Sequence, residues 1–84
     1  MLTKEILEEI NICLCDTDLQ YIRVMITGIQ NVVWSHYNRG LITQDKIELF
    51  SGVMYYLELA SREWSIEYTK DRLAEAKKLI VGEA

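Results

Sequence analysis

The segment from Thr43 to Val81 constrains the fold more than any other part of the chain, because no residue in it ends a helix. It contains no proline and a single glycine, Gly52, and these are the residues that most often terminate helices. Thr43 has the hydroxyl of an N-cap residue, and Lys77 and Lys78 lie where a helix favours positive charge. The sequence therefore predicts that nearly all of this segment is helical.

The length of this predicted helix leaves two possible arrangements. A continuous helix over residues 43–81 would be about 58 Å long at roughly 1.5 Å per residue. A compact domain of 84 residues has a radius of gyration of about 12 Å. Either the helix is continuous and its second half leaves the bundle to pack on another subunit, or it breaks near Ser61–Glu63 and a fourth helix folds back.

Two apolar stripes occupy different sides of the predicted helix. At about 100° per residue, the first stripe runs along one face from Ile47 to Tyr68. The second lies roughly 120–180° away and repeats every seven residues; its members are Leu59, Ile66, Leu73 and Ile80. Since two stripes need two sets of neighbours, the pattern favours the continuous helix and predicts that the second stripe forms a homodimer interface.

Two amphipathic helices are predicted before this segment. The first covers residues 3–14 and the second covers residues 18–38, with Asp16 or Thr17 as the N-cap of the second. The second helix has a broad apolar stripe from Leu19 to Tyr37. Both helices have the pattern of elements that cover a core with one face and meet water with the other.

The connection after the second helix predicts a helical hairpin. Gly40 can adopt the left-handed conformation that ends a helix, and only Leu41 and Ile42 separate it from Thr43. So short a loop makes the two flanking helices antiparallel neighbours. The expected fold is therefore all-α: a single-domain small helical bundle over residues 1–84, with this hairpin at its centre and a long C-terminal helix.

Composition excludes several classes of protein. Half of the residues are hydrophobic, which argues for a folded core. The net charge of −4 argues against direct binding of nucleic acid, which needs clustered lysine and arginine. No apolar run approaches the ~18–20 residues that span a membrane, and the first residues lack the pattern of a secretion signal. We therefore expect a cytoplasmic chain with reduced thiols.

No set of residues with catalytic or metal-binding spacing is apparent. On a helix, the sulfurs of Cys13 and Cys15 would point about 200° apart, whereas zinc sites usually need four ligands at recognisable spacings. His36 is the single histidine and lies at the edge of an apolar face, which favours a structural role; a pH-sensitive role is a second hypothesis. We therefore expect no metal, no cofactor and no enzymatic activity.

Four residues are candidates for binding another protein. Trp34 faces away from the apolar stripe of its own helix, which suggests burial against a second surface, although single exposed apolar residues are common. Glu63, Glu67 and Asp71 are spaced four residues apart and begin an acidic row that ends at Glu75. Such rows are usually solvated, and the alternative hypothesis is that this one docks against a basic surface.

Together these features predict a non-enzymatic helical interaction module that self-associates and binds another protein as a small regulator, adaptor or inhibitor. One alternative is a structural subunit of a larger assembly. Another is an acidic decoy that uses the row from Glu63 to Glu75 to block a nucleic-acid-binding protein. The short, acidic and all-helical composition is of the kind seen in small interaction proteins of bacteria and phages.

Overall fold

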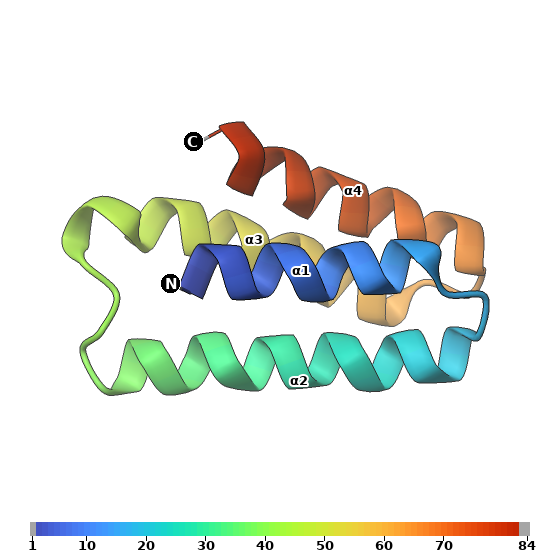
Figure 1. The fold of residues 1–84 in the computed structure, drawn as a ribbon, viewed down its shortest axis with the longest axis horizontal. Coiled ribbons are helices and arrows are strands. Elements are labelled where there is room, and N and C mark those ends of the chain that lie inside the picture. The colour runs from blue at the N-terminus through green and yellow to red at the C-terminus, as the bar shows by residue number, and fades with distance from the viewer. Residues whose placement is uncertain (1, 83–84) are drawn as a thin grey trace.

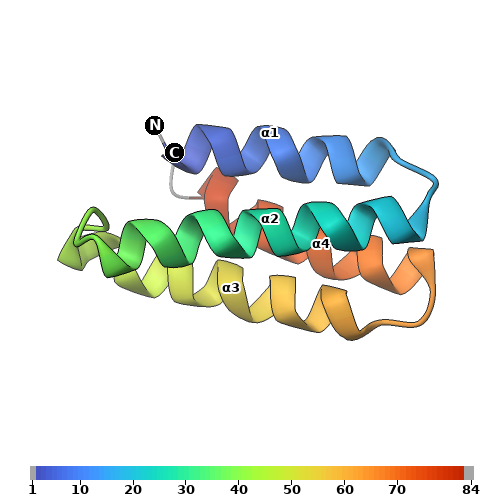
Figure 2. The same ribbon diagram turned by 90° about the horizontal axis from the view of Figure 1, so that it is seen from below.

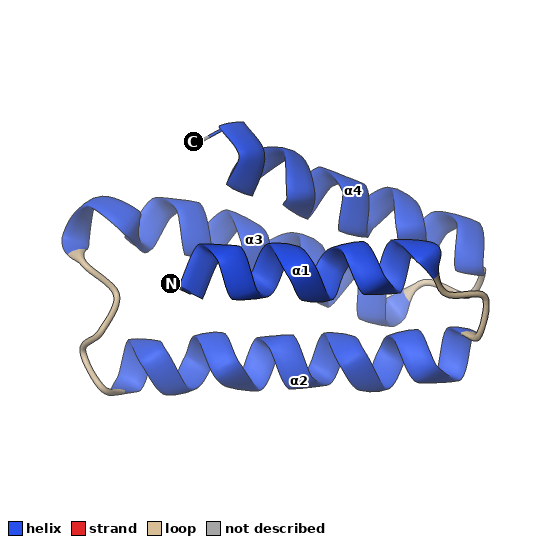
Figure 3. Ribbon diagram, viewed as in Figure 1, coloured by secondary structure: helices blue, strands red, loops and turns tan. Residues whose placement is uncertain are grey.

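The computed structural model describes residues 2–82 and contains, within that range, helices and no strand. The elements are α1 (Leu2–Cys15), α2 (Leu19–Asn38), a 3-10 turn (Gln44–Lys46), α3 (Ile47–Arg62) and α4 (Ile66–Gly82). Successive helices run in opposite directions (Figure 1) and are joined by short connections (Figure 3). The prediction of an all-α bundle with an antiparallel α2–α3 hairpin is confirmed.

The four helices surround one apolar core. Helix α1 packs against α2 and α4, and α3 packs against the same two helices, so the elements form a closed ring (Figure 2). Each helix contributes a fully buried side chain: Ile10, Ile26, Leu57 and Leu73. Removal of such apolar surface from water is the dominant favourable term in folding, and it explains the radius of gyration of 12.0 Å.

Helices α3 and α4 form the most extensive helix pair. Each of the two helices has a fully buried alanine, Ala60 in α3 and Ala76 in α4. Gly52 also faces α4, since a Cβ built on it would lie 2.9 Å from Cδ1 of Leu79. The missing side chain at Gly52 therefore leaves room for Leu79 at the contact between α3 and α4.

The N-cap of α2 is Asp18, so the prediction of Asp16 or Thr17 was wrong. The Asp18 carboxylate accepts hydrogen bonds from the backbone N–H of Gln20, at 3.0 Å, and of Tyr21, at 3.4 Å. Asp16 instead accepts a 2.8 Å bond from the backbone N–H of Asp18. The Asp16 side chain therefore stabilises the turn before the helix and leaves the cap to Asp18.

Gly40 ends α2 as predicted. Its φ of +68° is left-handed, and two backbone bonds close the helix end: Leu41 N–H to the His36 carbonyl at 2.9 Å, and Gly40 N–H to the Tyr37 carbonyl at 3.1 Å. These are the two bonds of a Schellman motif. The Thr43 hydroxyl, by contrast, makes no capping bond, and α3 begins only at Ile47, after the 3-10 turn.

The prediction of a continuous C-terminal helix is wrong, and the alternative prediction of a break followed by a fourth helix is confirmed. Helix α3 ends at Arg62, and Glu63 is extended, with φ −72° and ψ 147°. The chain then reverses and α4 folds back along α1 and α3. Because the chain turns at this break, α4 has a different orientation from α3. The two apolar stripes, which would lie on different sides of one continuous helix, therefore both face the same core.

This reversal places the predicted dimer residues within the bundle. Leu73 is fully buried and Ile80 is 5% exposed, Ile66 packs against the core, and Leu59 is partly buried. Neighbours from the same chain cover Leu73 and Ile80 and cover Leu59 and Ile66 in part. The structure therefore removes the reason for assigning these four residues to a dimer interface.

Two aromatic residues expected on the first stripe lie outside the core for the same reason. Trp64 is 93% exposed in the α3–α4 connection, and Tyr68 is also exposed, on the first turn of α4. The first stripe itself is buried only up to Ala60, where α3 is about to end. The break thus leaves an indole almost entirely in solvent.

We predict that Leu73→Ala destabilises the chain by about 2–5 kcal/mol, because it leaves a cavity in the core. Leu79→Ala on the same helix is the matched control, and its smaller loss reflects a side chain that is already 37% exposed. Urea unfolding followed by circular dichroism measures both variants. Equal losses would contradict the burial of Leu73.

Candidate partner-binding surface

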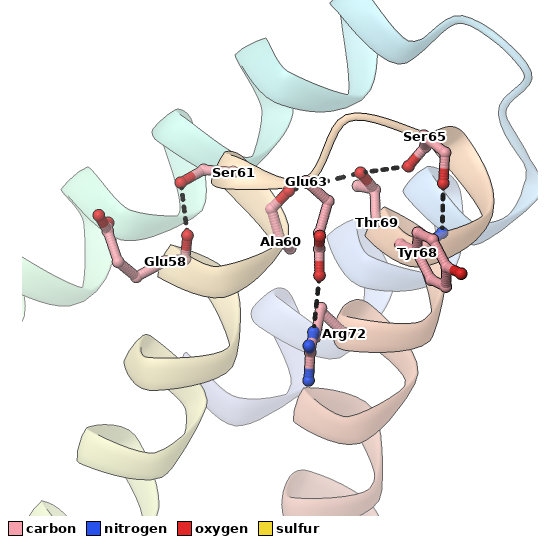
Figure 4. Close-up of polar contacts among 8 residues, drawn as sticks. All are labelled: Glu58, Ala60, Ser61, Glu63, Ser65, Tyr68, Thr69 and Arg72. Carbon is pink, nitrogen blue, oxygen red and sulfur yellow. Dashed lines mark hydrogen bonds and ion pairs between the residues drawn. The ribbon is translucent and has the colours of Figure 1, made fainter.

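The connection between α3 and α4 fixes the position of Glu63, the first residue of the predicted acidic row. Ser65 caps α4, because its hydroxyl accepts a 3.1 Å bond from the Tyr68 N–H. The buried Thr69 hydroxyl donates to the Ser65 carbonyl at 2.9 Å and lies 3.4 Å from the Ala60 carbonyl. Figure 4 shows these bonds around the turn, which together tie the end of α3 to the start of α4.

Glu63 has a structural role at this turn. Its carboxylate accepts a 2.9 Å bond from Nε of Arg72 (Figure 4), and this bond raises the pKa of Arg72. Its backbone carbonyl accepts a 2.9 Å bond from Arg23 of α2. Glu63 therefore links three helices. Glu63 does not belong to the predicted acidic row, because the prediction assumed one helix through residues 63–75 and the chain is extended at Glu63.

The rest of the acidic row lies on α4. Glu67 and Asp71 are exposed, and Glu75 lies 3.4 Å from the ammonium group of Lys78. Glu67 and Asp71 are therefore solvated on the first half of α4, and Glu75 is partly buried further along the helix. Nothing in their geometry brings them into one site with Trp34, which is near the opposite end of the bundle at the α2–α3 connection.

Trp34 lies off the core, as its position on the helix predicted, and is 54% exposed. Tyr37, one turn further along α2, is 51% exposed. The two rings meet edge to face, with centroids 5.9 Å apart and an interplanar angle of 88°. This edge-to-face geometry is favoured for aromatic contacts, and we call the pair the aromatic wall.

This aromatic wall borders a groove of about 340 Å³ between the end of α2 and the start of α3. The remaining lining is mostly apolar: Val33, Ile42, Ile47, Phe50, Ser51 and Met54. Val33 and Phe50 are buried and belong to the core, so the floor of the groove is held in place by the bundle. We call this site the Trp34 groove.

The exposed side of α2 is unusual for a surface helix because it lacks charge. Arg23 is the single Lys, Arg, Asp or Glu among the 20 residues of the helix, and its guanidinium is held by the Glu63 carbonyl. The exposed positions are Gln20, Tyr21, Val24, Thr27, Gly28, Asn31, Val32, Trp34, Ser35, Tyr37 and Asn38. Interface centres are depleted of charge and rich in aromatic residues, so α2 has the composition of an interface helix.

A second groove follows the other edge of α2, where it meets α1. It has a volume of about 500 Å³ and is lined by Glu5, Ile6, Glu9, Val24, Met25, Gly28, Ile29 and Val32. It shares no lining residue with the Trp34 groove. Helix α2 is therefore flanked by an apolar groove on each side.

The residues considered for chemistry do not converge in the described range. Within residues 2–82, no three His, Cys, Asp or Glu side chains are grouped so that they could hold a metal ion. Nδ1 of the partly buried His36 lies 2.9 Å from the Val32 carbonyl in the preceding turn. Cys13 is buried and Cys15 is exposed. No helix in this range is long and apolar enough to cross a membrane.

Comparison of the chain with known protein families, with characterised proteins and with solved structures found no match. The candidate surface is therefore defined by its own geometry. Sequence reasoning identified Trp34 but assigned Tyr37 and Val32 to the core stripe of α2, whereas both are exposed. The signal that was missed is the near absence of charge between residues 19 and 38.

We predict that one thiol reacts in the folded chain and two react after unfolding. Burial, together with the nearby carboxylates of Glu9 and Asp16, raises the pKa of Cys13 to about 11. At pH 8, only about one Cys13 side chain in a thousand would then be in the reactive thiolate form. Iodoacetamide labelling with and without urea, read by mass spectrometry, tests this, and Cys15→Ser is the control. Rapid labelling of both cysteines without urea would contradict it.

Proposed function

We propose that this chain is a non-enzymatic helical interaction module that binds another protein by accepting an apolar side chain in the Trp34 groove. The observation that carries the proposal is the half-exposed Trp34–Tyr37 pair at the rim of an apolar groove, on a helix that lacks charge. Tryptophan and tyrosine are among the residues that dominate binding energy at protein interfaces. Such a module acts as a small regulator, adaptor or inhibitor.

The size and lining of the groove favour a protein segment as the ligand. Its volume of about 340 Å³ is at the low end of the roughly 300–1,000 Å³ typical of small-molecule sites, which suits one or two side chains. An apolar anchor that enters it removes surface from water at about 25 cal/mol per Å². An amphipathic helix with spaced apolar anchors is a common ligand for such grooves.

The remaining candidate functions receive less support from the geometry. The acidic decoy depends on a continuous carboxylate row, but Glu63 is bound to Arg72 and lies outside α4. A structural subunit that needs its neighbours to fold would lack a complete core, whereas here all four helices contribute buried residues to one cluster. Both observations favour a module that folds alone and binds through its surface.

The test compares two tryptophans at opposite ends of the bundle. Wild type, Trp34→Ala and Trp64→Ala are used as affinity baits in an extract of the native host, and each captured protein is purified and its affinity measured. We expect Trp34→Ala to weaken binding by about 10- to 100-fold, as loss of a tryptophan anchor does. Trp64→Ala removes an equally large and more exposed ring and should have little effect.

Circular dichroism of both variants controls for folding, since neither side chain belongs to the buried core. Equal capture by wild type and Trp34→Ala would contradict the proposal. Loss of binding only in Trp64→Ala would place the binding surface at the α3–α4 connection instead.

A further inference from the structure

The groove between α1 and α2 differs from the Trp34 groove because one of its sides is charged. Glu5 and Glu9 line it from α1, and Val24, Gly28 and Val32 line it from α2. Figure 2 shows the two helices side by side, and theirs is the least extensive contact between neighbouring helices of the ring. The groove, which we call the α1–α2 groove, therefore has one acidic side and one apolar side.

The floor of the α1–α2 groove belongs to the apolar core. Ile6 and Ile29 are buried, and Met25 packs against the core. At the rim, Val24 is 67% exposed and Val32 is 41% exposed. An apolar ligand that covered these side chains would remove their surface from water, which is the main favourable term in most protein association.

The two glutamates on the α1 side have no countercharge. Within residues 2–82, no ion pair joins Glu5 or Glu9 to a basic side chain. Lys4 is the single basic residue of α1, and it does not line the groove. Glu9 is partly buried, and a carboxylate that is partly removed from water interacts more strongly with a nearby charge. The pair therefore selects a positively charged ligand.

This charge distinguishes among the ligands that fit an apolar groove. An anionic membrane surface and a nucleic acid are both repelled by Glu5 and Glu9. A second copy of the chain has the same net charge of −4 and would bring the same two carboxylates to a twofold contact. A basic ligand, by contrast, combines apolar contact with complementary charge.

The walls of the groove favour a helical ligand. Both walls are α-helices, and residues 2–82 contain no strand whose edge could pair with an extended segment. A third helix can insert a ridge of side chains between two packed helices. Glu5 and Glu9 are about 6 Å apart along α1, which is also the spacing of two residues four positions apart on a ligand helix.

We propose that the α1–α2 groove binds a basic amphipathic helix of another protein. The apolar stripe of that helix covers the α2 side and the floor of the groove. Two lysine or arginine residues, four positions apart beside the stripe, pair with Glu5 and Glu9. This surface is additional to the Trp34 groove and shares no lining residue with it, so either proposal can fail without the other.

Fluorescence anisotropy with designed peptides tests the charge preference. The probe is a fluorescein-labelled amphipathic helix of about 18 residues, with a leucine stripe flanked by lysines four positions apart. A matched peptide has glutamate in place of each lysine. We expect the lysine peptide to bind at least about tenfold more tightly than the glutamate peptide. Equal binding of the two peptides would overturn the proposal.

Neutral variants test which carboxylates are used. Glu5→Gln with Glu9→Gln should weaken binding of the lysine peptide about 3- to 30-fold, as expected for the loss of two partly exposed ion pairs. Glu67→Gln with Asp71→Asn removes the same charge at exposed positions on α4. This control should change the affinity less than about twofold at about 0.15 M salt, where distant charges are screened. Equal losses would indicate attraction to the overall negative charge and would overturn the assignment.

Gly28→Lys tests the groove with both carboxylates in place. Lysine favours a helix more than glycine does, and nothing lies within 4 Å of a Cβ built at this position, so the variant should fold. Its ammonium group should weaken binding of the lysine peptide at least about tenfold. Thr27→Lys adds the same charge at an exposed position that lines neither groove and should have a much smaller effect. Equal effects would contradict the proposal.

Heteronuclear NMR of the isotope-labelled chain locates the bound peptide. Addition of the lysine peptide should shift the backbone amide signal of Gly28, which lines the α1–α2 groove. The signal of Gly40, at the α2–α3 connection beside the Trp34 groove, should not move. A shift at Gly40 alone would place the peptide in the Trp34 groove and overturn the proposal. Concentration-dependent shifts of Gly28 without peptide would assign the groove to a second copy of the chain and would also overturn it.

Discussion

The turn between α3 and α4 is the constraint on which the rest of this fold depends. The chain reverses at Glu63, where Arg23 and Arg72 hold the backbone carbonyl and the carboxylate, and the buried Thr69 hydroxyl ties α4 to the turn. This reversal brings the apolar side of α4 onto α1 and α3. Without it, Leu73 would face solvent and the core would lack its fourth wall.

The fold was predictable wherever its signals are local. The extents of α1 and α2 and the left-handed Gly40 follow from periodicity and turn chemistry. The end of α3 near Ser61–Glu63 was predicted only as the less favoured of two arrangements, because residues 61–65 contain no glycine or proline. One hydrogen bond that stabilises this turn joins Arg23 and Glu63, which are 40 positions apart in the sequence. Patterns among neighbouring residues cannot reveal such a contact.

The candidate surface was predictable in part for a related reason. The position of Trp34 relative to its own helix was enough to place it outside the core. Tyr37 follows the apolar stripe yet is half exposed, because burial depends on whether a neighbouring helix covers that position. Here the turn after Gly40 and the 3-10 turn before α3 separate the two helix ends and leave the Trp34 groove. The position of a residue around its own helix does not reveal whether a neighbouring helix covers it.

Helix α2 forms a wall of both grooves, and it packs less extensively on its neighbours than α3 and α4 pack on each other. Because one helix borders both grooves, a ligand that shifted α2 at one edge would also change the groove at the other edge. A ligand bound in one groove would therefore change the affinity of the other groove for its own ligand. By thermodynamic linkage, the change is equal in both directions. One helix shared by two grooves thus gives a chain of this size a physical connection between two binding surfaces.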